Sequence, residues 1–139
     1  MTSEVDEKLH SNAPVVVIEA AGGCGKTTKA AKFAREIAER LDTGKVLLLS
    51  HTHAACGEFQ RKCAAMGKKI DVDTCDSFSL KVVSAYTKPL GLPSPLESHL
   101  GRPIDGISFS TLSEKAVELF RRSPTVARSV ATHYPVIVL

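Results

Sequence analysis

A glycine-rich segment between a strand-like run and a helix-like run constrains this chain more than any other feature. Residues 20–27 read AAGGCGKT and follow the β-branched run at residues 15–18. Glycine adopts backbone angles that other residues avoid, so Gly22, Gly23 and Gly25 can turn consecutive N–H groups toward one point. Such a loop at the start of a helix binds phosphate. The order of strand, glycine loop and helix therefore predicts an α/β domain that binds a nucleotide.

The last residues of this loop carry the predicted chemistry. The spacing is that of a P-loop with Ala20 in place of its leading glycine. Lys26 is then expected at the β- and γ-phosphates, and the Thr27 hydroxyl is expected to coordinate Mg²⁺, so these two are the predicted catalytic residues and Thr27 the metal ligand. The complete predicted nucleotide-binding set is Ala20, Ala21, Gly22, Gly23, Cys24, Gly25, Lys26, Thr27 and Thr28.

The apolar pattern alternates between strands and helices along the first half of the chain. Residues 14–19, 46–49 and 70–72 predict strands that are buried in a parallel sheet. Apolar stripes in residues 30–41 and 55–66 predict amphipathic helices between them. A further helix is predicted at residues 76–86. We therefore predict a three-layer α/β fold of the P-loop NTPase type, with a parallel sheet.

The second half of the chain is less regular. Proline and glycine recur through residues 87–110 and predict an irregular excursion there. Thr111 and Glu114 have the spacing of a capping box for the next helix, and Ser123 with Pro124 predicts the start of another. The sequence YPVIVL at residues 134–139 predicts a fully buried strand. Residues 1–13 are polar and residues 14–139 are predicted to form one domain.

Composition narrows the function classes. The chain has 139 residues with 18 Lys and Arg against 15 Asp and Glu, and the excess of positive charge lies within residues 14–69, where an anionic ligand is expected. No apolar run reaches the roughly 18 residues that cross a bilayer, and the N-terminus does not read as a signal peptide. The four cysteines form no CxxC pair, which favours free thiols. We predict a cytoplasmic protein without membrane partners.

Hydrolysis of a nucleotide requires a carboxylate that holds Mg²⁺ and another that orients water. Asp71, Asp73 and Asp76 lie near a predicted strand end. The first two are better explained as a solvated strand face and Asp76 as a helix N-cap. The required acids are expected after the strand at 134–139, beyond the last residue of the chain given.

Three blocks of sequence, in order, resemble the first motifs of the UvrD/Rep-type superfamily 1 helicases. They are IEAAGGCGKTT at 18–28, VLLLSHTHAACGEF at 46–59 and VDTCDSFSL at 72–80, and YPVIVL resembles the strand that leads into the DE-x-QD motif of that family. His53 and Asp76 depart from its pattern, which usually has Asn and His there. By position, the resemblance implies contacts to single-stranded DNA from His51, Thr52, His53, Thr74, Ser77 and Phe78.

The resemblance also implies a fold and an activity. Residues 14–139 are expected to be an incomplete RecA-like domain that binds ATP with Mg²⁺, in an enzyme that translocates 3′ to 5′ on DNA. The strand at 134–139 is expected beside the one at 14–19. Without the acidic motif and a second domain, the chain given is expected to be inactive alone and to hold DNA weakly. The remaining helicase domains are its expected partners.

Other interpretations remain open at this stage. The loop and the sheet are equally typical of a P-loop kinase of a nucleotide or small metabolite, or of a non-enzymatic nucleotide- or DNA-binding fragment. Phe78 is either a base-stacking side chain or part of the core. His51, His53, Cys56 and Cys63 include the residue types of a metal site, but their spacing matches no known finger and the cysteines suit a buried helix stripe.

Overall fold

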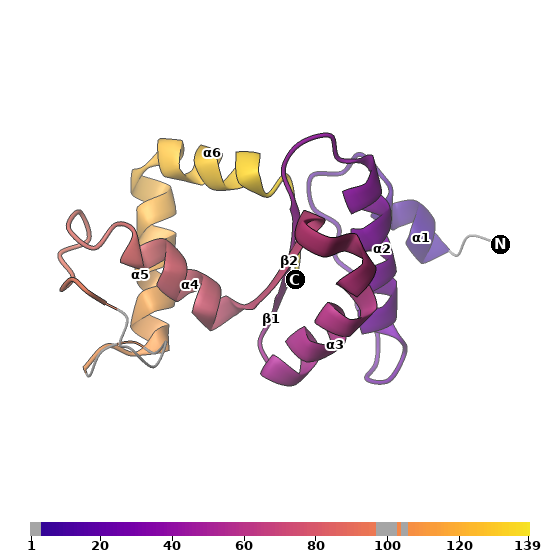
Figure 1. Ribbon diagram of the computed structural model, residues 1–139, viewed down its shortest axis with the longest axis horizontal. Helices are drawn as coiled ribbons and strands as arrows, with labels where there is room; N and C mark the ends of the chain where they lie inside the picture. The colour runs from indigo at the N-terminus through magenta and orange to yellow at the C-terminus, as the bar shows by residue number, and fades with distance from the viewer. Residues whose placement is uncertain (1–3, 97–102, 104–105) are drawn as a thin grey trace.

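The computed structural model describes residues 4–96, 103 and 106–139 and has an α/β fold (Figure 1). In the described part of the chain, strands β1 (Val46–Ser50), β2 (Ile70–Thr74) and β3 (Val136–Val138) form one sheet in the order β2-β1-β3. Both pairings are parallel, with Val46 opposite Ile70 on one side and Val136 on the other. The predicted fold class, α/β with a parallel sheet, is confirmed.

Helices lie on both sides of this sheet (Figure 1). On one side are α2 (Lys26–Arg40), α3 (His53–Cys63) and the 3₁₀ helix η1 (Ala64–Lys69). On the other side are α4 (Cys75–Ser84), α5 (Phe109–Arg122) and α6 (Pro124–His133), and the short α1 (Glu4–Leu9) lies next to α2. None of the helices in the described ranges is long and apolar enough to cross a membrane. The predicted order of strands and helices from residue 26 to residue 86 is confirmed.

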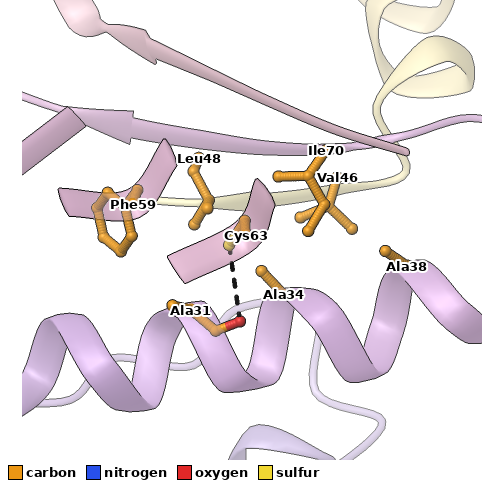
Figure 2. Packing of buried hydrophobic residues seen from close by; sticks show 8 residues of the cluster. All are labelled: Ala31, Ala34, Ala38, Val46, Leu48, Phe59, Cys63 and Ile70. Atoms are coloured by element: carbon orange, nitrogen blue, oxygen red, sulfur yellow. Dashed lines mark hydrogen bonds between the residues drawn. The ribbon is translucent and has the colours of Figure 1, made fainter. Parts of the chain in front are cut away.

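Small side chains bring α2 close to the sheet. Ala31, Ala34 and Ala38 recur on one face of α2 and are fully buried against the strands and α3 (Figure 2). Figure 2 shows Cys63 of α3 between α2 and the sheet, with its Sγ 4.0 Å from the carbonyl oxygen of Ala31. Without bulky groups on this face, backbone and strand approach closely and exclude water from Leu48.

A second apolar cluster holds the helices α4 and α5 together. Leu80 and Val83 of α4 pack with Leu112, Ala116 and Leu119 of α5. The first cluster packs against the sheet and this one packs helix on helix, so the described residues form two separate apolar clusters.

The strand predicted at residues 14–19 is absent from the structure, so this prediction is wrong. These residues are described but form no strand, and Val15 and Val17 are 75% and 77% exposed. A β-branched run favours extended backbone, but an extended segment becomes a strand only with a neighbour that completes its hydrogen bonds. The predicted pairing of the strand at 134–139 with this segment is also wrong, because the described sheet consists of β2, β1 and β3 and residues 14–19 form no strand.

Several predicted element ends also differ. β3 covers only three residues and is not fully buried, because Ile137 is 48% exposed. The cap of α5 is Ser108, whose hydroxyl accepts from the N–H of Thr111 at 3.1 Å, so the predicted capping box from Thr111 is wrong. The irregular stretch before α5 agrees with the prediction for 87–96, 103 and 106–108, while residues 97–102, 104 and 105 lie outside the described residues.

The polar N-terminal segment contains helix α1 and contacts α2. The Lys29 ammonium lies 3.4 Å from the Asp6 carboxylate, and the His10 ring lies 2.9 Å from the Glu36 carboxylate. The same ring packs edge-on against Phe33. Polar contacts thus hold a segment whose sequence shows no apolar stripe.

At the amino-terminal end of the sheet, polar groups join all three strands. Asp71 of β2 accepts from Tyr134 at 2.6 Å and from Lys45 at 3.0 Å. Burial tends to raise the pKa of Asp71, but these hydrogen bonds and the Lys45 charge outweigh it and hold the pKa below its usual value. Burial and the same carboxylate raise the pKa of Tyr134, which stays a donor at neutral pH.

Candidate functional site

The residues predicted to bind ligands gather at the carboxyl end of the sheet. The start of α2 and the connection from β1 to α3 lie at the same, lower end in Figure 1. β1 and β2 are parallel, and Ser50 at the end of β1 pairs with Thr74 at the end of β2. In open α/β sheets this is the edge where ligands bind.

The glycine loop has the backbone expected of a phosphate cradle. Gly23 and Gly25 have φ of 77° and 76°, in the left-handed region that favours glycine. Gly22 does not use this region, so its predicted conformational role is wrong. A Cβ built on any of these three glycines meets nothing within 4 Å, so the mouth of the loop is open.

Helix α2 begins directly after this loop and leaves its first turn uncapped by side chains. Gly25 is the N-cap residue and provides no side-chain hydrogen bond, and the first turn contains no acidic residue. Backbone N–H groups at such a helix start have no partner within the helix, and the helix dipole adds positive potential there. This start can therefore hold an anion.

Lys26 is the first residue of α2 and is exposed. Its ammonium group donates to the carbonyl oxygens of Ala20 and Ala21, the latter at 2.7 Å. The side chain therefore folds back across the loop and keeps its charge within the cradle. Thr27 is partly buried, whereas Cys24 and Thr28 are exposed.

The segment from His51 to His53 joins β1 to α3, and all three side chains are exposed. Thr52 is the N-cap of α3, and its hydroxyl accepts from the N–H of Ala55 at 3.2 Å. The hydroxyl hydrogen remains available for a further acceptor, because the cap uses only a lone pair.

Thr74, Ser77 and Phe78 begin helix α4. Thr74 is only 7% exposed, and its hydroxyl accepts from the N–H of Ser77 at 3.0 Å. Phe78 is partly buried and packs edge-on against Tyr134, with the ring centroids 6.4 Å apart. Thr74, not Asp76, is the N-cap, so the prediction of a cap at Asp76 is wrong.

The aspartates near β2 are not a free acid pair. Asp71 lies near the amino end of β2 and is bound to Lys45 and Tyr134. Asp73 forms an ion pair with Lys81 at 2.6 Å. Both carboxylates already hold a cation, so neither is an uncompensated acid that could orient water for hydrolysis.

A cavity of about 730 Å³ lies along β2, away from the loop. Its described lining includes Asp71, Asp73, Phe78, His133 and Tyr134, and no residue of the loop. Its acids have the partners given above. The loop is the stronger candidate for an anion site, because the Lys26 charge and the uncapped start of α2 converge there.

The cysteines of α3 are structural. Cys56 and Cys63 are 6% and 5% exposed and lie in the stripe that packs on the core, as predicted. Burial raises the pKa of both thiols, which disfavours the thiolate that binds metals. Among the described residues, no group of three or more His, Cys, Asp or Glu is placed to hold a metal ion.

Sequence reasoning missed Lys62, which the structure brings to the start of α2. Its ammonium group donates to the Thr28 hydroxyl at 2.8 Å. The two residues are 34 positions apart, and no motif marks Lys62. The sequence offers one indication of this contact. Cys63, the next residue, belongs to the apolar stripe of α3 that packs against α2, so Lys62 lies close to that interface.

Comparison with protein families agrees with this geometry. The family model described as UvrD/REP helicase N-terminal domain matches residues 1–102. Searches of curated proteins and of solved structures gave no match. The matched range covers the loop and both strand-to-helix connections that end at the same edge of the sheet. The chain belongs to the UvrD/REP helicase family and matches the N-terminal domain of that family over residues 1–102.

Proposed function

We propose that this chain is the ATP-binding part of an ATP-dependent, 3′ to 5′ DNA helicase of the UvrD type. The observation that carries the proposal is the start of α2, where an open glycine loop, an uncapped helix end and Lys26 meet. Family membership supports a helicase over a small-molecule kinase with the same loop.

The residues at the loop fit a nucleotide with Mg²⁺. The left-handed Gly23 and Gly25 support a cradle of N–H groups, and Lys26 supplies a cation that can leave the backbone carbonyls for a phosphate. Thr27 would hold Mg²⁺ through its hydroxyl. When bound, the metal would neutralise charge on the β- and γ-phosphates.

The second part of the proposal concerns single-stranded DNA. The exposed side chains of His51, Thr52 and His53 lie at the same sheet edge as the helix start that carries Thr74, Ser77 and Phe78. This set contains no lysine or arginine, and the net charge of the chain is only +3, so we expect weak, salt-dependent binding by this chain.

We further propose that residues 1–139 bind ATP without measurable turnover. In the described part of the chain, Asp71 and Asp73 are paired with lysines, and Asp71 lies at the end of the sheet opposite the loop. An arginine finger, which can be worth roughly 10³ to 10⁵ in rate, would have to come from another domain. Turnover that oligo-dT stimulates and Lys26→Ala abolishes would contradict this.

Calorimetric titration with Mg-ATP tests the nucleotide site. Lys26→Ala should weaken binding about tenfold or more, because it removes the cation that the loop holds. Lys32→Ala is the matched control, since Lys32 lies on the same helix but pairs with Glu36 at 3.8 Å. Equal affinities for wild type and Lys26→Ala would overturn the proposal.

A further inference from the structure

The first turn of α2 receives a cation from a neighbouring helix. Lys62, near the end of α3, places its ammonium group 2.8 Å from the hydroxyl of Thr28. Arg35 of α2 donates to the carbonyl oxygen of Lys62 at 3.3 Å. Two hydrogen bonds therefore link Lys62 to α2, one through its side chain and one through its backbone.

The position of the Lys62 ammonium group beside the start of α2 is electrostatically unfavourable when no ligand is bound. The start of a helix carries positive potential, so a cation there is unfavourable. The first turn of α2 has no acid of its own and already contains Lys26. Glu58, one turn back on α3 and 3.4 Å from the Lys62 ammonium, offsets part of this repulsion but is 41% exposed. An anion at the loop would relieve the remainder.

We propose that Lys62 is a second cation of the nucleotide site, which acts on the phosphate chain beside Lys26. The inference rests on the proposed function. The Lys62 side chain is 32% exposed and hydrogen-bonds Thr28, which follows the loop directly in the first turn of α2. Its ligand class is a polyphosphate, which is the part of a nucleotide that the positive start of α2 attracts.

The experiment compares uncharged and charged replacements of Lys62 by calorimetric titration with Mg-ATP and with inorganic triphosphate. Lys62→Met and Lys62→Gln should each weaken binding of both probes about tenfold. Lys62→Arg should retain affinity within about threefold, because it keeps the charge. Thermal unfolding of each variant without ligand reports its stability separately.

Lys69→Met is the matched control. Lys69 donates to the carbonyl oxygen of Ala38 at 3.3 Å, so it also lies against α2 but at the opposite end of the helix. Its replacement removes the same charge and should leave the affinity for both probes unchanged.

Three outcomes would overturn the inference. Wild-type affinity in Lys62→Met, alongside a loss in Lys26→Ala, would remove Lys62 from the site and leave the proposed function intact. If Lys62→Gln binds both probes as tightly as wild type while Lys62→Met does not, Lys62 acts through its hydrogen bond to Thr28 and its charge has no role. If wild type binds neither probe, the proposed function fails and this inference fails with it. Should Lys62→Met not fold, the Gln and Arg variants decide.

Discussion

The two ends of the sheet are built in different ways. At the amino end, the polar side chains bind one another: Asp71 accepts from Lys45 and Tyr134 and so ties the three strands together. At the carboxyl end, β1 leads to a helix start with exposed side chains at His51, Thr52 and His53, although Thr74 at the end of β2 is buried.

This difference indicates which end of the sheet is available to ligands. Polar groups at the amino end have their hydrogen bonds within the protein, so a ligand there would have to replace existing partners. Helix starts at the carboxyl end have backbone N–H groups directed away from the helix. Changes at the amino end should therefore alter stability alone, whereas changes at the carboxyl end should also alter binding.

The largest expected loss of stability is at the amino end, for Gly44→Ala. Gly44 has φ of +80°, and a Cβ there would lie 2.8 Å from the Cδ of Pro135 and 3.1 Å from the carbonyl oxygen of Thr132. Left-handed strain and the clash should together lower the free energy of unfolding by about 3 kcal/mol. Urea unfolding measures it.

Gly91→Ala separates the two causes. Gly91 also has positive φ, +67°, but a Cβ there meets nothing within 4 Å. Its replacement should cost about 1 to 2 kcal/mol from strain alone. Equal losses for both variants would show that Pro135 moves aside. If folded Gly44→Ala binds Mg-ATP more weakly than wild type, changes at the amino end of the sheet do not alter stability alone.

The next largest effect is expected for Asp71→Asn, which removes a charge that Lys45 and Tyr134 stabilise. Because the carboxylate is about one third exposed, we expect a loss of about 1.5 kcal/mol near pH 7. The pKa of Asp71 is lowered from 3.8 in the folded protein, so the carboxylate stabilises the fold fully only above the unfolded value.

The pH dependence follows from this sign. As the pH falls below about 4 toward the lowered pKa of Asp71, the carboxylate becomes protonated and its contribution is lost. The difference in unfolding free energy between wild type and Asp71→Asn should then shrink. Gly91→Ala serves as control, since its backbone strain involves no titrating group and its difference from wild type should not change with pH. If the difference between wild type and Asp71→Asn stays constant down to pH 3, the charge of Asp71 is not the cause of the lost stability.

Two apolar runs of similar sequence show how far the fold can be predicted. Residues 46–49 form a central strand because β2 and β3 pair with it on both sides. Residues 15–18, VVVI, are more β-branched than residues 46–49, VLLL, but have no pairing partner in the described structure and stay largely exposed. Periodicity and β propensity report which backbone a segment prefers. They do not report whether a neighbouring strand is present, which depends on distant parts of the chain.

The candidate site was predictable to the extent that it is local in sequence. The loop, Lys26 and the threonines Thr52 and Thr74 follow from short motifs, and the structure brings them to the same sheet edge. Whether they bind nucleotide and DNA stays a prediction. Lys62 could not be found this way, because its contact with Thr28 depends on how α3 packs against α2.

The smallest expected effect is at the carboxyl end, for Thr52→Ala. Thr52 caps α3 from an exposed position, so removal of its hydroxyl should lower the free energy of unfolding by about 0.5 kcal/mol. The same hydroxyl can still donate to a phosphate, so affinity for oligo-dT, measured by fluorescence anisotropy at low salt, should fall about threefold. Ser108→Ala removes an equivalent cap from α5 and should cost similar stability without a change in affinity. Thr52→Ser should restore both quantities. If Thr52→Ala lowers stability but leaves the affinity of wild type, Thr52 is a cap alone, and the carboxyl end resembles the amino end more closely than we infer.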